Sequence, residues 1–340
     1  MLMRIAALIA ACALVGCGGA SSTVNPLTPT RIIAFGDAFS TVNQYGYANF
    51  SVNTSSTDAT VASRIATIYG FTLYDYSSLS SATAVVPSGS AISYAYGTAT
   101  AGTTNATYNV TSQITTYLTQ NTPGSKDLFI ITAGTQDIAR AAPSNDTTAI
   151  ASAATTLTTQ IQRLTDAGAE YVLVMQPINV ARTPPFLSAS GVRPVGANWT
   201  ALINGYAQAL SYDSGTACQS FSCLLSTKLN TAFPATSSHQ PVLLVDLMSY
   251  FNLITGTTNT GSANTFGTYG VTNPDLVVCS TAVPSCTTST LATTSTNQYT
   301  STAWTYATSV FAYDYYTTPY VNQLMGSYIY NYNFYRAGWR

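Results

Sequence analysis

The chain has 340 residues, 46% of them hydrophobic and only 7% charged, with a formal net charge of −1 at pH 7. Its length allows one large α/β domain or two small ones. The weak charge excludes the basic surface that nucleic-acid binding needs and any long-range steering of an ionic ligand. Ser, Thr, Asn and Tyr supply the missing polarity, a composition that suits a secreted or envelope protein.

The first residues carry an export signal. Met1–Arg4 is short and positive, and Ile5–Val15 is apolar but far too short to span a bilayer. This run ends in Leu14-Val15-Gly16-Cys17, which resembles a lipobox, the cleavage and acylation site of bacterial lipoproteins. We therefore expect a signal peptide over residues 1–16 and a lipid on Cys17. The alternative is an ordinary secretory signal with a chance cysteine.

The residues after Cys17 bear on location. Residues 17–30 are small, polar and proline-containing, so we expect a flexible tether between the lipid and the folded body. Gly18, rather than Asp, follows the cysteine, which by resemblance to lipoprotein sorting signals favours the outer membrane. The expected partner is thus a membrane, reached through the acyl chains on Cys17.

Continuous apolar runs that end at Gly, Pro or Asp predict buried parallel strands, because both faces of such strands are covered. These runs are Arg31–Phe35, Lys126–Thr132, Tyr171–Met175 and Pro241–Asp246. Apolar residues at helical spacing predict helices between and after the strands. These helices are Ile150–Asp166, Asn198–Leu210, Leu224–Phe233 and Pro319–Tyr330. Strands alternating with helices predict a three-layer α/β/α sandwich with a mostly parallel sheet, as one domain over residues 31–340.

The segment Ile254–Asn297 is rich in Thr, Gly and Asn, and we expect it to be a long loop. Once Cys12 leaves with the signal and Cys17 is lipidated, four cysteines remain. Their spacing favours two local disulfides, Cys218–Cys223 and Cys279–Cys286, in an oxidising compartment. A metal site is the alternative, but no cluster of His or carboxylate residues lies near them in the sequence. We expect no metal and no cofactor.

Four segments fall where a parallel sheet binds ligands, just beyond the carboxyl ends of strands. They are Phe35-Gly36-Asp37-Ala38-Phe39-Ser40, Ser93-Tyr94-Ala95-Tyr96-Gly97, Ala133-Gly134-Thr135-Gln136-Asp137 and Asp314-Tyr315-Tyr316-Thr317-Thr318-Pro319. In this order they resemble the four blocks of the SGNH (GDSL) esterase family. The resemblance spans nearly the whole mature chain. It implies an α/β/α sandwich and hydrolysis of esters by a serine, a histidine and an aspartate beside an oxyanion hole.

The resemblance also exposes departures at the catalytic positions. Ala38 stands at the family's serine nucleophile, and a methyl group cannot attack a carbonyl. Thr317 stands at the histidine base, and a hydroxyl does not accept a proton near neutral pH. Gln136 replaces the asparagine oxyanion donor and is one methylene longer. Gly97, the other donor, and Asp314, the acid, are retained.

Two other residues are possible substitutes. Ser40 lies two positions past Ala38, but on a turn that opens a helix we expect it to point away from the attack site. His239 is the sole histidine, and it precedes the strand Pro241–Asp246, which places it at the opposite edge of the sheet. We interpret His239 as a loop residue.

The remaining residues of the blocks have a structural and a binding interpretation. Asp37 and Asp137 suit turns in which a carboxylate accepts backbone N–H bonds. Together with Tyr315 and Tyr316 they are the residues we expect at the former substrate cleft, where an acyl, glycan or peptide ligand would bind. Further tyrosines, Tyr328–Tyr335, favour packing of a closing helix.

The sequence thus predicts an envelope lipoprotein of esterase ancestry without ordinary serine esterase activity, acting as a binding or structural protein. The alternative is an ester-bond hydrolase, like a carboxylesterase or lipase, that works through other residues such as Ser40.

Overall fold

A computed structural model describes residues 26–43, 49–54, 56–79, 84–102, 108–186, 201–213, 217–234, 240–256, 265–292 and 305–340. The expected lipidation site Cys17 and the histidine His239 lie outside these residues. No helix among the described segments combines the length and the hydrophobicity that a bilayer crossing needs.

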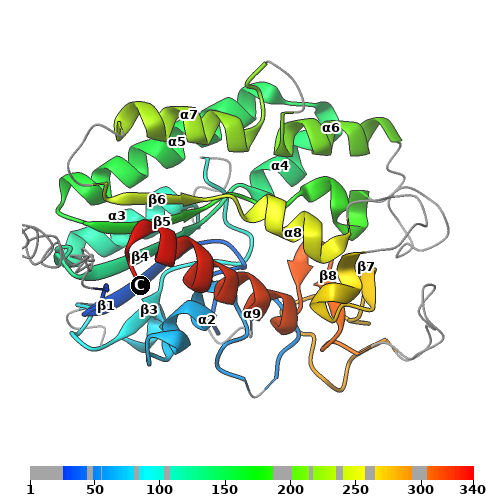
Figure 1. Ribbon diagram of the computed structural model, residues 1–340, viewed down its shortest axis with the longest axis horizontal. Coiled ribbons are helices and arrows are strands. Elements are labelled where there is room, and N and C mark those ends of the chain that lie inside the picture. Colours follow the sequence, from blue (N-terminus) through cyan, green and yellow to red (C-terminus); the bar gives the residue numbers. More distant parts are fainter. Residues whose placement is uncertain are drawn as a thin grey trace, which may run out of the picture.

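A parallel sheet of six strands forms the centre of the molecule (Figure 1). Its strand order is β2-β3-β1-β4-β5-β6, and every pair of neighbours is parallel. The strands are β1 (Arg31–Gly36), β2 (Leu73–Asp75), β3 (Ala91–Ser93), β4 (Asp127–Thr132), β5 (Tyr171–Met175) and β6 (Val242–Val245). The four longer strands coincide with the predicted apolar runs to within two residues. The expected α/β sandwich with a parallel sheet is confirmed.

Helices cover both faces of this sheet, because alternate residues of each strand point to opposite sides. Ile33 and Phe35 of β1 belong to a core that includes residues of α3, α4, α5, α6 and α7. Ile32 and Ala34 belong to a second core, shared with α2, α8 and α9. The helices are α2 (Val61–Ile68), α3 (Val110–Gln120), α4 (Thr135–Ala141), α5 (Thr147–Asp166), α6 (Ala201–Ser211), α7 (Phe221–Ala232), α8 (Leu247–Thr255) and α9 (Pro319–Tyr328).

Several of these helices have a Thr or Asp at the N-cap, whose side chain accepts a hydrogen bond from a backbone N–H of the first turn. Thr60 caps α2 through a reciprocal bond with Ser63, and Asp146 and Asp246 cap α5 and α8. Thr318 caps α9, and Pro319, which has no N–H to lose, takes its first position. A π-helical turn, η7 (Ile329–Phe334), and the short α10 (Tyr335–Ala337) continue α9 to the C-terminus.

The segment expected to be one long loop contains regular structure. Within Ile254–Asn297 the chain forms the 3-10 turn η6 (Thr265–Tyr269) and the strand β7 (Asn273–Val277). β7 pairs with β8 (Ser309–Tyr313), and β8 pairs with β9 (Tyr316–Thr317), to give a small separate sheet. The expectation failed because β7 contains Asn, Pro and Asp, which are rare in strands. Its partner β8 supplies the pairing.

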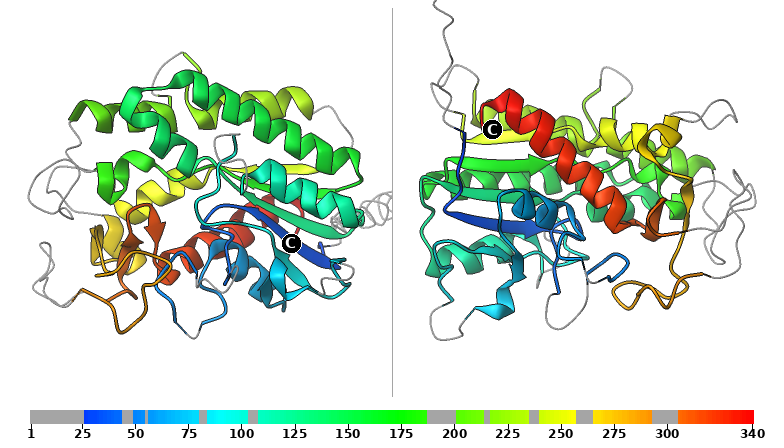
Figure 2. Two further views of the ribbon diagram at one scale, coloured as in Figure 1. Left: turned by 180° about the vertical axis from the view of Figure 1, so that it is seen from behind. Right: turned by 60° about the horizontal axis from the view of Figure 1, so that its bottom comes forward.

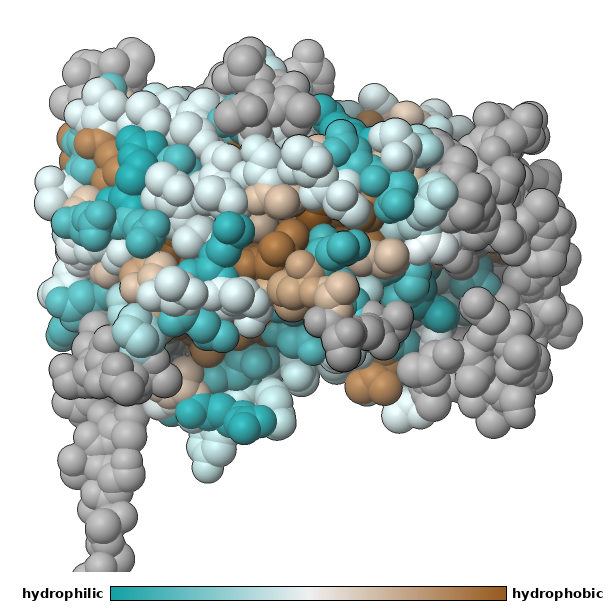
Figure 3. Space-filling view, turned by 90° about the horizontal axis from the view of Figure 1, so that it is seen from above, coloured by the Kyte–Doolittle hydropathy of each residue, from teal (hydrophilic) through white to brown (hydrophobic). Residues whose placement is uncertain are grey.

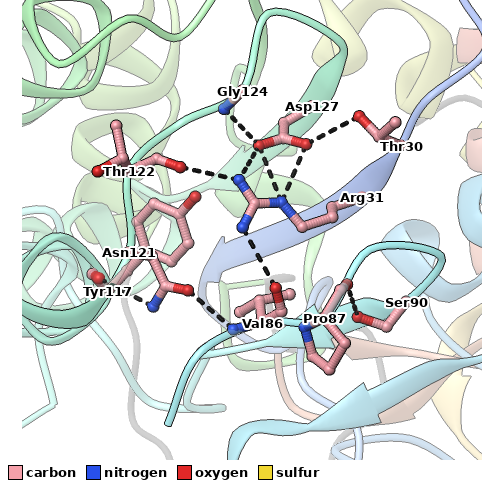
Figure 4. A network of polar contacts seen from close by, with 10 residues as sticks. All are labelled: Thr30, Arg31, Val86, Pro87, Ser90, Tyr117, Asn121, Thr122, Gly124 and Asp127. Atoms are coloured by element: carbon pink, nitrogen blue, oxygen red, sulfur yellow. Dashed lines mark hydrogen bonds and ion pairs between the residues drawn. The ribbon is translucent and has the colours of Figure 1, made fainter. Parts of the chain in front are cut away.

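The amino edge of the main sheet is fixed by a buried ion pair (Figure 4). The Arg31 guanidinium contacts both carboxylate oxygens of Asp127, with its Nε lying 3.1 and 3.0 Å from them. It also donates to the carbonyls of Val86 and Thr122, so one side chain ties β1 to two other loops. The hydrogen bonds that the guanidinium donates to Asp127 raise the pKa of Arg31.

The first described residues pack against this same end of the molecule. Leu27 is buried, and its N–H donates to the carbonyl of Trp339 at 3.0 Å. The Thr30 N–H donates to the carbonyl of Lys126. Pro26–Thr30, which the sequence assigns to the end of the tether, therefore lies against the body. Figure 2 shows this N-terminal segment beside the C-terminus.

Figure 3 views the molecule from the side of α5, α6 and α7. Hydrophilic and near-neutral residues cover most of this face, and apolar residues gather in a narrow central strip. Hydroxyl and amide groups thus supply the polar surface of a chain in which only 7% of the residues are charged.

Candidate functional site

Three loops and one hairpin meet beyond the carboxyl ends of the central strands. The loop after β1 starts at Gly36, whose φ of +117° favours glycine. A Cβ there would lie 1.7 Å from the carbonyl oxygen of Thr132 on β4, so no side chain fits. The amide of Gln113, from α3, accepts from the Gly36 N–H at 2.6 Å and donates to its carbonyl at 3.0 Å. The turn after β1 is therefore fixed by the Gln113 amide and by its close contact with the backbone of β4.

Asp37 uses its carboxylate inside this turn. The Phe39 N–H donates to Oδ1 of Asp37 at 3.2 Å, and the Asp37 N–H donates to the carbonyl of Thr132 at 2.9 Å. The side chain is fully buried. Burial, with a smaller contribution from the nearby Asp137 carboxylate, raises the pKa of Asp37 to about 7. Asp37 thus stabilises the loop.

Asp137 has the same kind of role on the neighbouring loop. Its carboxylate accepts from the N–H groups of Ala101 and Gly102, at 2.8 and 3.1 Å. Burial raises the pKa of Asp137, and the two N–H donors act against this shift. Because Asp137 lies in the first turn of α4, it joins the loop after β3 to the loop after β4. The carboxylates of both aspartates accept hydrogen bonds from backbone N–H groups and are buried, so neither is exposed to a ligand.

Ala38 and Ser40 occupy the turn between β1 and the following loop. Ala38 is buried and offers only a methyl group. Ser40 has no exposed surface; its hydroxyl accepts from Oγ1 of Thr132 at 3.0 Å, and its carbonyl accepts from the hydroxyl of Ser93 at 2.7 Å. Neither residue presents an activated oxygen at the surface.

Two aromatic rings cover the positions that resemble an oxyanion hole. A Cβ on Gly97 would lie 2.2 Å from the ring of Phe50, so that ring rests directly on the glycine. Nε2 of Gln136 donates to the hydroxyl of Tyr316 at 3.5 Å. The rings of Phe50 and Tyr316 are 5.4 Å apart. Burial and the nearby Asp314 raise the pKa of Tyr316, so its hydroxyl stays protonated.

The hairpin β8–β9 carries the last block. Asp314 adopts a φ of +23° in its two-residue turn. Thr317 is 2% exposed and donates to Oδ1 of Asn322 at 2.5 Å, and Nδ2 of Asn322 donates to the carbonyl of Ala59 at 2.8 Å. The position that the sequence motif assigns to a histidine base is thus occupied by a hydroxyl that is already bonded inside the protein.

A row of aromatic rings crosses this edge of the sheet. Successive rings in it have centroids between 4.1 and 6.4 Å apart. The row runs through Tyr108, Tyr96, Phe50, Tyr316, Tyr315 and Phe186. Sequence reasoning found Tyr315 and Tyr316 but missed the other four. Tyr96 stands directly before Gly97 and was a usable signal, whereas Phe50 lies in a polar stretch without any pattern.

The model of the GDSL-like lipase/acylhydrolase family matches residues 32–266, more than half of the chain. The chain belongs to the GDSL-like lipase/acylhydrolase family. No curated protein matches it. The family match includes the blocks at Asp37, Gly97 and Gln136 and ends before the hairpin with Asp314 and Thr317. The assignment of that last block therefore rests on its motif and on its position before α9.

Both predicted disulfides are present, Cys218–Cys223 and Cys279–Cys286. The second lies in a small core with Val52 and Ala312, next to the hairpin. Near the first, the carboxylate of Asp213 accepts from the N–H groups of Gln219 and Ser220. Asp213 and the two sulfurs are close enough to share a metal ion. However, the sulfurs are bonded to each other and the carboxylate closes the turn before α7.

Proposed function

We propose that this member of the GDSL-like family is an envelope lipoprotein, anchored through Cys17, that lacks ordinary serine esterase activity and acts as a binding or structural protein. One observation carries the proposal: the attack position is the methyl group of Ala38, and the family's oxyanion donors are covered by Phe50 and Tyr316.

The size of the loss follows from how catalytic groups work together. Removing one member of a serine triad lowers kcat by about 10⁴- to 10⁶-fold, and removing a second adds little. What remains, roughly 10³- to 10⁴-fold over water, depends on binding and on the oxyanion hole. Here the Gln136 amide contacts the Tyr316 hydroxyl at 3.5 Å, so this residual catalysis is reduced as well.

The geometry does not favour hydrolysis through Ser40. That hydroxyl is fully buried and accepts a hydrogen bond from Thr132. A nucleophile needs a base within about 3.2 Å and an open path to the substrate. The neighbouring titratable group is Asp37, whose carboxylate is committed to the Phe39 N–H.

The aromatic row supports the binding role. Tyr96, Tyr108 and Tyr315 are partly exposed, and they offer flat apolar faces with hydroxyl groups at their ends. Such surfaces suit a sugar ring, an acyl chain or an aromatic side chain of a peptide. A ligand that reached Gly97 would first displace the ring of Phe50.

The catalytic part is tested with the purified mature protein, on short p-nitrophenyl esters and with a fluorophosphonate probe. We expect hydrolysis at the background rate and no covalent adduct, and the Ser40→Ala variant should behave identically. A family esterase with an intact serine serves as the positive control. An adduct on any hydroxyl of this chain, or turnover that Ser40→Ala abolishes, would contradict the proposal.

The anchor is tested separately in cells. Growth with a labelled fatty acid should label the protein, and Cys17→Ser should remove the label and release the protein from the membrane fraction. Labelling that survives Cys17→Ser would show that the lipid is elsewhere.

A further inference from the structure

The end of the chain carries an exposed aromatic and basic surface, which we name the C-terminal face. It consists of Tyr328, Tyr332, Tyr335, Arg336 and Arg340. Tyr332 and Tyr335 are 46% and 69% exposed, and Tyr335 is the most exposed large hydrophobic side chain of the described residues. Soluble surfaces seldom expose large rings in groups, so such a group indicates contact with something else.

The side chains of the C-terminal face are held in place by one another. The ring of Tyr328 stacks on Tyr250 at 4.0 Å and on Tyr332 at 5.4 Å. The Arg336 guanidinium lies 5.3 Å from the Tyr332 ring and donates to its hydroxyl at 2.8 Å. Asp246, an exposed acid, and Arg336 both lie near Tyr328.

The second arginine is held by two residues of the π-helical turn. Arg340 lies 4.9 Å from the ring of Tyr330 and donates to the side chain of Asn331 at 2.9 Å. Rings and guanidinium groups that are ordered beforehand lose little conformational freedom when they bind. The side chains of the C-terminal face are therefore ordered in advance, which lowers the entropic cost of binding.

The start of the described chain lies against this same region (Figure 2). Leu27 donates its N–H to Trp339, one residue before Arg340. Cys17 is ten positions earlier in the sequence, and ten residues span at most about 35 Å even when fully extended. A lipid on Cys17 would thus keep Leu27, which is bonded to Trp339 beside the C-terminal face, within that distance of the bilayer.

We propose that the C-terminal face docks on the surface of the membrane that holds the Cys17 lipid. The chemistry fits a bilayer interface, where tyrosines place the ring among acyl chains and the hydroxyl among headgroups. Arg336 and Arg340 pair there with the phosphates of anionic lipids. This inference rests on the lipid anchor of the proposed function.

The end of the chain and the candidate site lie apart in the molecule. The C-terminus lies at the amino edge of the main sheet, because Trp339 packs on Tyr171 at the start of β5. The aromatic row lies at the carboxyl edge, the opposite end of the strands. The tether to Cys17 therefore leaves the body at the end of the sheet away from the candidate site.

The test measures the depth of single residues at the membrane. The mature chain is coupled through the Cys17 thiol to a maleimide lipid in vesicles of phosphatidylethanolamine and phosphatidylglycerol, with brominated acyl chains as quenchers. In Tyr335→Trp we expect at least twofold more quenching of the added fluorescence than in Tyr212→Trp. Tyr212 is the matched control, because it is 50% exposed and directly follows α6, which packs on the other face of the sheet. Each variant is compared with the parent chain to subtract the native tryptophans.

A second measurement addresses the charges. With Cys17→Ser, the unanchored chain should still bind the anionic vesicles weakly. Arg336→Gln with Arg340→Gln should then reduce binding by about fivefold for each arginine removed. Arg140→Gln, an exposed arginine on α4, should leave it unchanged.

The outcomes separate the two proposals. Equal quenching at residues 335 and 212 in coupled protein would overturn docking, whatever the cell experiment shows about the lipid. Absence of fatty-acid label in cells would overturn the natural anchor, while the coupled vesicles would still show whether this face meets the bilayer.

Discussion

The two edges of the central sheet bury carboxylates in different ways. At the amino edge, Asp127 meets the guanidinium of Arg31, so the buried charges neutralise each other (Figure 4). At the carboxyl edge, Asp37 and Asp137 are buried with backbone N–H groups and a hydroxyl as neighbours, and the pKa of each is raised. The ion pair at the amino edge thus joins strands and loops. The carboxyl edge holds the loops whose sequences resemble the blocks of the family, and its carboxylates bind backbone N–H groups.

The largest expected effect is at the amino edge. Asp127→Ala leaves the Arg31 guanidinium without its carboxylate in a largely buried place, so the free energy of unfolding should fall by about 3–5 kcal/mol. Urea denaturation followed by circular dichroism measures this. Asp58→Ala is the matched control, since it removes the more exposed pair with Arg64 and should cost less than about 1 kcal/mol. Equal losses would mean that the burial of the Arg31 pair is unimportant.

The next effect is at the carboxyl edge. Asp137→Ala leaves the N–H groups of Ala101 and Gly102 without their acceptor, and should cost about 2–3 kcal/mol. Asp137→Asn keeps one acceptor oxygen and should cost about half as much, measured in the same way. If the two variants were equally stable, the carboxylate would not be what holds the loop after Gly97.

Asp37 should make stability depend on pH. Its pKa is about 7 in the folded protein, against 3.8 ordinarily, so the folded state holds a proton that the unfolded state has lost. The contribution of the Asp37 proton to the free energy of unfolding is fully present below about pH 4 and is lost as the pH rises through 7. The free energy of unfolding should fall by up to about 1.4 kcal/mol for each pH unit in that window. Asp37→Asn should remove this slope; a variant with an unchanged slope would assign it to another group.

The smallest effect concerns the ring that covers Gln136. Tyr316→Phe removes a hydrogen bond of 3.5 Å and keeps the contact with Phe50, so it should cost less than about 1 kcal/mol. Thermal unfolding detects this difference, and a larger loss would show that the hydroxyl matters more than the ring.

Much of the fold could be predicted because buried parallel strands appear as continuous apolar runs. Tyr171–Met175 has the same bounds in the sequence prediction and in the structure. The strands β2 and β3 have three residues each, too few to form a pattern. β7 has a composition unfavourable for strands and depends on its partner β8.

The candidate site could be located because each block directly follows a strand or precedes a helix. The sequence therefore places Ala38 and Gln136 just beyond strand ends and Thr317 just before a helix, at the edge where the structure has them. What covers them could not be predicted. The contact of Phe50 with Gly97 depends on how the loop after β1 folds back, and the bond from Thr317 to Asn322 depends on tertiary packing.

The bond between Thr317 and Asn322 makes position 317 resistant to substitution. A histidine at position 317 is larger than threonine and would enter a place that is only 2% exposed, where Asn322 also supports Ala59. Placing an imidazole there would therefore require a second change at Asn322. Any design that installs a serine and a histidine in this chain would need coordinated changes at Ala38, Thr317 and Asn322.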